Sequence, residues 1–488
     1  MKQNITEDIF FEDSKDTVDR IKEILKDNSD IVYREFFING TVKAALIYID
    51  GMADKILLDD YVLESLMDKD EEDINVNNIK DRLLTISDLR EVDKLSKGID
   101  GFLSGDTLLL IDGLKKAYII ANRSWPARGI SEPLGETVVR GSREGFAETI
   151  RFNTALVRRR IRDTKFRIKS KTIGVRSKTD VVIMYIDDIV RDGLVEEVEK
   201  RLDKIKIDAI LDSGYVEQLI QDDKWSIFPH IQSTERPDVV AAALYEGRVA
   251  ILVDNSPFAL IAPSTLINLF QSPDDYYQGW INSSIVRFVR NLGVLFSLII
   301  PALYVAITSF HTSIIPTKLA YSIASSREGV PFPAFVEAII MELSLTFLME
   351  AVVRLPKPIG STVGIVGGLI IGQAAVSAGI VSPIMIIIVS VTAITSFMIP
   401  NYGVSNAFRI VRFFLIIASA IIGLYGIVIG LIILLIHLLK MKSFGVSYLS
   451  PMVNTHFKDF KDFMFRVPID NMKERPEYMN TKDKIRQK

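Results

Sequence analysis

Residues 359–399 read IGSTVGIVGGLIIGQAAVSAGIVSPIMIIIVSVTAITSFMI, and this stretch decides the fold of the C-terminal half of the chain. It lies in a window, residues 358–408, that contains no Asp, Glu, Lys or Arg. A helix needs roughly 20 apolar residues to cross a hydrocarbon layer of about 30 Å, so the window has room for two spans. A core helix of a soluble protein does not need such a length. The stretch therefore predicts membrane-spanning helices.

Two more windows without these charged residues, 291–317 and 413–439, have room for one span each. Residues 291–439 hold ten of the 119 charged residues (58 basic and 61 acidic), and the other 339 of the 488 residues hold 109. Such an uneven distribution is typical of a soluble protein joined to a membrane protein. We therefore expect an all-α polytopic membrane domain over residues 286–440.

The rest of the chain has the pattern of a soluble α/β protein. Runs of β-forming residues flank Asn39-Gly40 and Asp112-Gly113, which are strong hairpin signals. Further along, strands and helices alternate, which predicts a mixed sheet flanked by helices. We expect an N-terminal tail (1–30), a first α/β module (31–123), a linker rich in Gly, Pro and Ser (124–145), a second α/β module (146–285) and, after the membrane domain, a C-terminal tail (441–488).

The composition argues against several kinds of function. The chain has no cysteine and only four histidines, none at helical ligand spacing from another, so we expect no disulfide, no metal site and no cofactor. It lacks the common nucleotide-binding and nucleophile motifs, so we expect no enzymatic activity. A net charge of −3 gives no sign of a nucleic-acid partner. The N-terminus lacks the apolar core of a signal peptide, so we expect the soluble modules in the cytoplasm.

A basic run in the second module has an ordinary interpretation. Arg158, Arg159, Arg160 and Arg162 end a predicted helix. We interpret the run as a solvated helix end. Contact with anionic headgroups or with a partner subunit is the alternative.

The segment 333–355 is apolar enough to span a membrane, yet it carries four charged residues. At 100° per residue, Glu342, Glu350 and Arg354 share one helix face, whereas Glu337 points elsewhere. Charges that face lipid cost several kcal/mol each, so this face must meet protein or a water-filled cavity.

Two interpretations of the charged face remain open. In one, it lines an ion pathway or a subunit contact. In the other, the segment near 333–355 is an amphipathic or re-entrant helix in which Glu350 pairs with Arg354 and stabilises only the fold. Prolines at both ends favour the re-entrant helix, which leaves about four spans, whereas a crossing helix would give five. Because Arg354 can neutralise only one glutamate, we expect Glu342 to be unpaired and to meet water or a cation.

Small residues recur at every fourth position of the next apolar stretch. Gly364, Gly368 and Gly372 form a ridge that allows close approach of another backbone. We interpret the ridge as a helix-packing surface within or between subunits, with a pore wall as the alternative. Gln373 is a lone polar side chain in this span, and we group it with the candidate ion-pathway residues.

Several long stretches resemble the A subunits of the GerA-type germinant receptors of spore-forming bacteria. The similarity runs from about Glu132 to Pro451, through RGSREGFAETIRFNTALVRRRIR, TERPDVVAAALYEGRVAILVDNSPFALIAPS, SPDDYY, PALYVAITSFH, REGVPFPAFVEAIIMEL, RLPKPIGSTVGIVGGLIIGQAAVSAGIVSPIMIIIVS and SFGVSYLSP. The sequence departs from the family pattern at Ser142 and Ser447, where the family favours proline. It also departs in LMEAVVRLP, where the family usually has a Leu-Arg-Glu-Ala run, so we expect an altered charge network there.

The resemblance implies a subunit of a nutrient-sensing receptor in the inner spore membrane, with its soluble modules and C-terminal tail on the cytoplasmic side. It implies two partners, a transporter-like B subunit and a lipoprotein C subunit, and assembly of A subunits into an oligomeric ion channel within the lipid. A family paralogue that acts with the dipicolinic-acid release system is the main alternative. A secondary transporter is more distant, because about four spans are few and the 333–355 pattern has no second copy.

Overall fold

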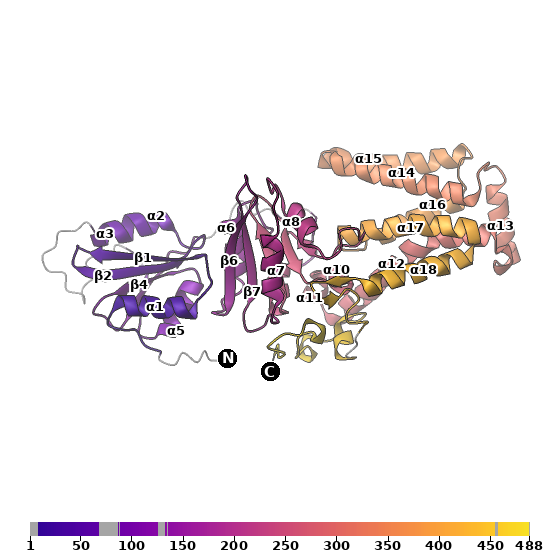
Figure 1. Ribbon diagram of the computed structural model, residues 1–488. Helices are drawn as coiled ribbons and strands as arrows, with labels where there is room; N and C mark the ends of the chain where they lie inside the picture. The colour runs from indigo at the N-terminus through magenta and orange to yellow at the C-terminus, as the bar shows by residue number, and fades with distance from the viewer. Residues whose placement is uncertain are drawn as a thin grey trace. The chain divides into compact units, whose positions relative to one another are not determined.

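The computed structural model describes residues 8–67, 86, 88–124, 132–133, 135–453 and 457–487. It confirms the predicted fold class, because two modules with antiparallel sheets come first and a helical region follows (Figure 1). The contacts divide the chain into an N-terminal unit (1–224, 231–263 and 473–488) and a helical unit (225–230 and 264–472). The sequence had placed this boundary near residue 285.

The first module is a five-stranded sheet in the order β1-β2-β4-β5-β3, with every neighbouring pair antiparallel. Side chains of α1 and α5 join the core on one side of the sheet, and those of η1 and α3 join a second core. The elements are α1 (Ser14–Ile24), β1 (Ile31–Ile38), β2 (Val42–Ile49), α2 (Lys55–Leu57), η1 (Leu58–Leu63), α3 (Glu64–Met67), β3 (Leu89–Val92), α5 (Leu95–Leu103), β4 (Thr107–Ile111) and β5 (Ala117–Ile120).

The second module is also a five-stranded antiparallel sheet, in the order β6-β7-β9-β10-β8. Its core is made of apolar side chains from α6, α9 and the strands. The elements are α6 (Ile150–Arg158), β6 (Phe166–Ile173), β7 (Thr179–Ile186), α7 (Leu194–Asp203), α8 (Ser213–Ile220), β8 (Gln232–Thr234), α9 (Pro237–Tyr245), β9 (Val249–Val253) and β10 (Ala259–Ala262).

The two modules are copies of one topology. Strand order, strand direction and the positions of the helices correspond, and residues 107–120 superpose on 249–262 in sequence without a gap. Asp112 follows β4 and accepts a hydrogen bond from the backbone N–H that starts α1, at 3.0 Å. Asp254 follows β9 and accepts one from the N–H that starts α6, at 3.1 Å. The N-terminal unit is therefore a tandem repeat, which the sequence analysis did not detect.

Most of the basic run at the end of α6 is not solvated as predicted, although Arg162 is exposed. The Arg158 side chain is fully buried, and its guanidinium donates to both carboxylate oxygens of Asp30, at 2.8 and 3.0 Å. Arg159 and Arg160 both pair with the half-buried Glu144. The run therefore joins the first module and the 135–147 segment to the second module.

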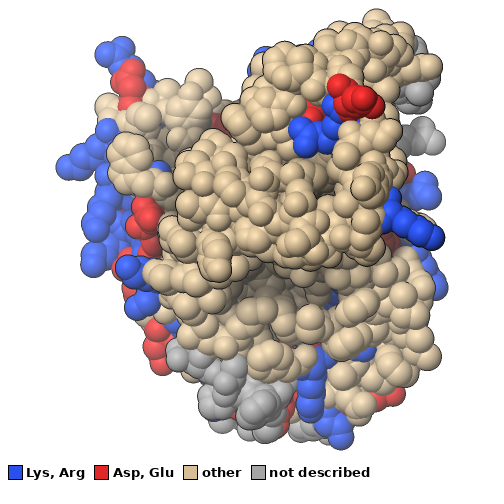
Figure 2. All heavy atoms as spheres, turned by 90° about the vertical axis from the view of Figure 1, so that its right-hand side faces the viewer, with Lys and Arg blue, Asp and Glu red and all other residues tan. Residues whose placement is uncertain are grey.

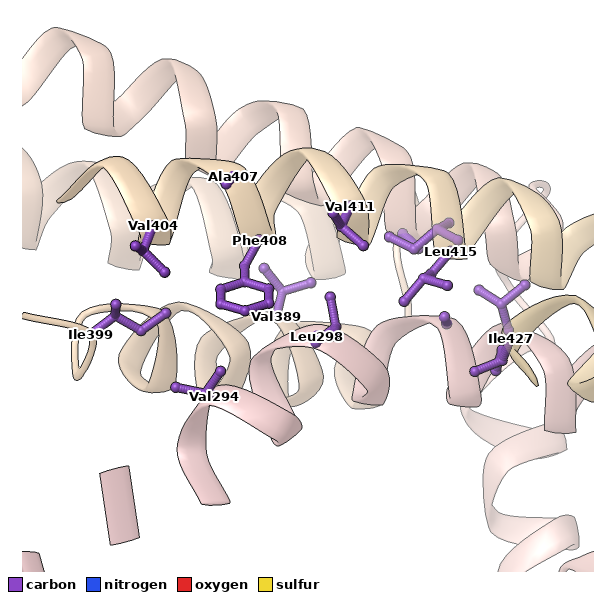
Figure 3. Packing of buried hydrophobic residues seen from close by; sticks show 14 of the residues in the cluster. Val294, Leu298, Val389, Ile399, Val404, Ala407, Phe408, Val411, Leu415 and Ile427 are labelled. Carbon is purple, nitrogen blue, oxygen red and sulfur yellow. The ribbon is translucent and has the colours of Figure 1, made fainter. Parts of the chain in front are cut away.

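The helical unit packs its long helices through small and branched apolar residues. Figure 3 shows Val404, Phe408, Val411 and Leu415 on the buried face of α17, opposite Leu298 and other α12 residues. The elements are α10 (Leu266–Phe270), α11 (Asp274–Tyr277), α12 (Trp280–Ser309), η3 (Thr312–Ile314), α13 (Thr317–Arg327), α14 (Ala334–Arg354), α15 (Lys357–Ser377), α16 (Pro383–Ser396), α17 (Tyr402–Ile422), α18 (Leu424–Lys440), β11 (Lys442–Ser443), β12 (Val446–Ser447), η4 (Phe457–Asp462) and η5 (Ile469–Asn471).

Neighbouring long helices run in alternating directions. Gly364 of α15 lies against Val352 of α14, and Gly367 lies against Leu348, so these two helices form an antiparallel hairpin. The same geometry joins α12 to α16 and α14 to α17. Figure 3 shows α12 and α17 advancing in the same direction. The six helices α12, α14, α15, α16, α17 and α18 therefore alternate up and down in chain order.

The apolar window 413–439 does not form one span as predicted. The chain turns at Gly423, whose φ of 62° and ψ of −138° are unfavourable for residues with a Cβ. Gly426 and Gly430 then lie against Ala418 and Leu415, which lets α18 pack back along α17. The window is a helical hairpin, and its first helix starts well upstream at Tyr402.

Two helices in the described part of the chain, α12 and α17, are long and apolar enough to cross a membrane. The 21 residues of α14 form an uninterrupted helix about 32 Å long, which is close to the thickness of a bilayer core. Its charged residues set it apart from α12 and α17, and they form the site described next.

Candidate functional site

A buried ion pair joins α14 to α17. The Arg412 guanidinium donates from Nη1 to both Glu342 oxygens, at 3.0 and 3.2 Å, and from Nη2 to Ser396 Oγ at 2.6 Å. The two charged side chains are 2% and 1% exposed. The sequence analysis expected Glu342 to be unpaired, and that expectation is wrong in this structure. It considered partners only on the same helix, whereas Arg412 lies 70 residues away.

The local sequence explains why Arg412 points inward. Phe408 and Leu415 lie one turn before and after it, on the same buried face of α17. Ser396 ends α16 and is itself buried, so three helices enclose the pair. The Arg412 Nε is buried and has no hydrogen-bond partner within the described residues. A pair taken out of water in this way is costly to break, because loss of one partner strands the other charge at about 3–5 kcal/mol.

A second buried carboxylate lies near the start of α14. Glu337 is fully buried, and its Oε1 accepts a hydrogen bond from Arg327 Nε at 3.1 Å. Its other oxygen accepts the Ser382 backbone N–H at 2.9 Å, at the start of α16. Glu337 therefore ties the ends of α13, α14 and α16 together. The sequence analysis noted only that Glu337 pointed away from the other charges.

The remaining charges of α14 lie apart from Glu342. Arg354 Nε donates to Glu350 at 2.8 Å, one helical turn away. Both side chains are more than half exposed. The structure therefore brings Glu350 and Arg354 together, as expected, but it does not join them to Glu342.

The glycine ridge of α15 lies at the edge of the helical unit. A Cβ at Gly364 or Gly372 would be in ordinary contact with Val352 or Ile386, at 3.7 Å, whereas a Cβ at Gly368 would meet no atom within 4 Å among the described residues. Gln373 is exposed. The position at Gly368 is therefore open as far as the described residues extend.

Much of the exterior of the helical unit is apolar. Figure 2 shows a broad surface of residues other than Lys, Arg, Asp and Glu on the face that turns α13 toward the viewer, interrupted by a small charged group. Large apolar side chains such as Phe347, Phe414, Tyr425 and Ile433 are more than half exposed. In water such a surface would be unfavourable, but a lipid environment would cover it.

A third charged cluster lies near the N-terminal end of α12. Asp275 is buried and accepts hydrogen bonds from Arg287 and Arg290, at 2.9–3.2 Å. Arg287 also donates to Asp462 at 2.7 Å. This cluster fastens the segment after residue 457 to α12. Among the described residues, no group of three His, Cys, Asp or Glu side chains could hold a metal ion.

The chain was compared with known families and structures. The model of the Bacillus/Clostridium GerA spore germination protein family matches residues 19–478. Spore germination protein GerLA of Bacillus cereus is 42% identical over 466 residues, 95% of each chain. Spore germination protein B1 of Bacillus subtilis is 42% identical over 484 residues, 98% of this chain and 99% of the relative. The uncharacterized membrane protein YfkQ of Bacillus subtilis is also 42% identical, over 95% of this chain and 90% of its own.

The comparison with solved structures gave a shorter match. The crystal structure of the N-terminal domain of the A subunit of the Bacillus megaterium spore germinant receptor GerK3 is 38% identical, with a TM-score of 0.43. The match covers 54% of this chain and 98% of that domain.

Proposed function

This chain belongs to the Bacillus/Clostridium GerA family of spore germination proteins, and from this premise we propose that its helical unit forms the ion-conducting part of a nutrient germinant receptor. The chain is the A subunit in this proposal. A nutrient signal opens the conducting part and releases monovalent cations from the spore. No catalytic step is involved.

The arrangement of the helices supports a membrane location. In this proposal the helices of alternating direction carry the chain across the bilayer an even number of times, and α12 and α17, which are long and apolar enough to cross it, are two of the passes. An even number of passes returns the chain to its starting side. The N-terminal unit and the segment after residue 440 then both lie on the cytoplasmic side of the inner spore membrane. The apolar exterior of the unit supports this proposal.

The observation that carries the conduction proposal is the Glu342–Arg412 pair. It lies where α14, α16 and α17 meet, and charged groups at membrane depth persist mainly on ion pathways or at helix contacts. In the closed state Arg412 neutralises Glu342. Separation of α14 from α17 exposes the carboxylate to water, and Glu342 then attracts a permeating cation.

The first test uses the pair itself. Glu342→Gln strands the buried Arg412, so we expect about 3–5 kcal/mol of lost stability and less protein in the spore membrane. Replacing both residues by leucine removes both charges and should restore the amount of protein. If the pair controls conduction, the double variant releases cations at least about tenfold more slowly after the nutrient trigger, which corresponds to about 1.4 kcal/mol. Immunoblots and flame photometry of released ions provide the two measurements.

The exposed pair on the same helix supplies a matched control. Glu350→Gln combined with Arg354→Gln removes one charge of each sign from α14 without opening a buried site. This variant should keep both the protein level and the ion release. Wild-type release rates in the double leucine variant would instead make the buried pair purely structural.

The proposal also includes partners. A transporter-like B subunit and a lipoprotein C subunit complete the receptor, and several copies of this chain surround the conducting path. The open position at Gly368 supports contact between copies, because a small residue on an unfilled helix face permits close approach of another helix. Vesicles that contain this chain with its partners should show ligand-dependent monovalent cation flux. Substrate exchange by this chain alone would favour a transporter.

A further inference from the structure

The segment between α8 and β8 enters the helical unit. Residues 225–230 read WSIFPH and belong to the helical unit, although the residues on both sides of them belong to the N-terminal unit. The chain therefore leaves the second module for six residues and returns to it. Residues 225–230 are therefore covalently continuous with the second module at both ends, although they pack within the helical unit.

The insertion is anchored by Phe228, which is 1% exposed. Its ring meets the edge of the Phe408 ring on α17, with 5.4 Å between the centroids and an angle of 80°. Tyr448 and His437 complete the aromatic surroundings, at 6.5 and 6.2 Å. Edge-to-face aromatic contacts of this kind fix relative orientation and add about 0.5–1.5 kcal/mol beyond burial.

The neighbours of Phe228 hold the loop at two further points. His230 Nδ1 lies 2.8 Å from the Lys442 carbonyl oxygen, and Ser443 Oγ donates to the His230 carbonyl at 2.6 Å. Pro229 packs against Gly403, where α17 begins. The loop therefore contacts the start of α17 and the residues that follow α18, and it cannot shift without disturbing both.

The contact continues into the ion pair. Phe408 and Arg412 are four residues apart on the buried face of α17, and Arg412 holds Glu342 of α14. Phe270 stacks on Phe408, with 6.1 Å between the ring centroids, and it limits sideways movement of that ring. Close-packed interiors are hard to compress and transmit strain, so a displacement of Phe228 should reach α17 through the Phe408 ring.

We propose that Phe228 is a positioning residue that couples the second module to the Glu342–Arg412 pair through α17. The functional consequence rests on the proposed function, because coupling matters for ion release only if the pair controls conduction. A change of state in the second module moves the 225–230 loop, and the loop moves α17 relative to α14.

The absence of cysteine from the chain permits a direct test of positioning. Ser419→Cys introduces a single thiol at a fully buried position of α17, beyond Arg412, and Ser405→Cys introduces one two residues after Gly403, against which Pro229 packs. In full-length protein in detergent, Phe228→Ala should raise the alkylation rate at position 419 by about three- to tenfold, which corresponds to a coupling of about 0.6–1.4 kcal/mol. Phe228→Leu should have a smaller effect, and it replaces the alanine variant if that variant does not fold.

A matched control separates coupling from general loosening. Leu449 is buried in the same apolar cluster but lies in the segment after α18. Leu449→Ala also creates a cavity, but outside α17. It should leave the alkylation rate at position 419 within about twofold of the parent, because distant sites act independently. Equal increases with Leu449→Ala and Phe228→Ala would overturn the proposal. The proposal would also be overturned if Phe228→Ala raised the alkylation rate at position 405 but left the rate at position 419 unchanged.

The second readout is made in spores. Phe228→Ala should reduce nutrient-triggered cation release by about tenfold relative to the amount of membrane protein, and Leu449→Ala should not. If Phe228→Ala spores released cations at the parent rate, coupling to conduction would be wrong. If the parent chain conducted no cations with its partners in vesicles, the proposed function would fail. The alkylation rates would still decide whether Phe228 positions α17.

Discussion

At the scale of single residues, Glu136 shows how tertiary contacts change chemistry. Burial raises the pKa of this carboxyl to about 7, although Thr234 Oγ1 donates a hydrogen bond to it at 2.5 Å and thereby lowers the pKa. Glu235 and Asp238 raise the pKa further, and Arg236 lowers it. Because the carboxyl is neutral in acid, the folded N-terminal unit is favoured at low pH.

The stability of the N-terminal unit should therefore depend on pH through Glu136. The folded pKa lies above the unfolded value of about 4.3, so this stabilisation is complete below pH 4.3 and is lost as pH rises to about 7, by about 3 kcal/mol. The Glu136→Gln variant has no ionisable group at this position. The thermal unfolding midpoint of the full-length variant should therefore change less with pH, between pH 5 and 8, than that of the parent. Glu217 is the control, because burial also raises its pKa to about 7. Glu217→Gln should remove only the pH dependence of stability that Glu217 itself contributes. Superimposable curves for Glu136→Gln and the parent would contradict this.

Sequence identified several charged residues but few of their partners. Glu342 stood out because a carboxylate in an apolar helix is expensive, and Glu350 and Arg354 were paired correctly because their separation is local. Arg412 was missed as a partner because periodicity within one helix carries no information about the next. The same reason explains Arg158, whose partner Asp30 lies 128 residues away.

At the scale of elements, α15 presents a glycine face whose role can be tested. Among the described residues, a Cβ at Gly368 would meet no atom within 4 Å, whereas a Cβ at Gly367 would lie 2.9 Å from Leu348 of α14. Gly368→Leu should therefore leave the α14–α15 hairpin intact and disrupt only contacts between copies. The expected result is a smaller oligomer in detergent with an unchanged unfolding midpoint.

Gly367→Leu is the matched control for this prediction. It should lower the unfolding midpoint, because Leu348 must move to admit the new side chain, at a typical overpacking cost of about 1–3 kcal/mol. An unchanged oligomer in Gly368→Leu would remove the glycine ridge from the subunit contact.

The apolar windows predicted helical membrane segments but not where the helices end. The window 413–439 has no charged residue, so composition gave no reason to divide it. The division depends on Gly423, where the chain reverses, and on small residues that let α18 lie against α17. Composition also misplaced a helix boundary at Arg409 and Arg412, which interrupt the apolar windows but lie inside α17. The helix continues through Arg412 because a buried partner, Glu342, compensates its charge.

At the scale of the whole molecule, the tandem repeat was hidden by divergence. Residues 107–120 and 249–262 align without a gap, yet they are identical at only four of 14 positions: Leu110/Leu252, Asp112/Asp254, Ala117/Ala259 and Ile119/Ile261. A repeat at this level is not visible in composition. Its two modules were predicted separately because each has its own hairpin and helix signals.

The C-terminal segment was predicted as a tail, but residues 473–487 pack on the second module. Arg475 Nε donates to the Tyr245 carbonyl at 2.7 Å, the Lys482 N–H donates to the Ile189 carbonyl at 3.1 Å, and Met479 is 1% exposed. Burial of one methionine side chain contributes about 1.5–3 kcal/mol. This segment therefore stabilises a module that precedes it by more than 200 residues in sequence.

Truncation after Met472 should therefore destabilise the N-terminal unit by about 2–3 kcal/mol while the helical unit keeps its resistance to heat. Pulse proteolysis of full-length and truncated protein in detergent, with cleavage sites assigned by mass spectrometry, measures the two units separately. Met479→Ala should reproduce most of the loss, because the buried side chain supplies most of the apolar contact, and the exposed Lys484→Ala should reproduce none. Equal protection of the second module in truncated and full-length protein would contradict a stabilising role.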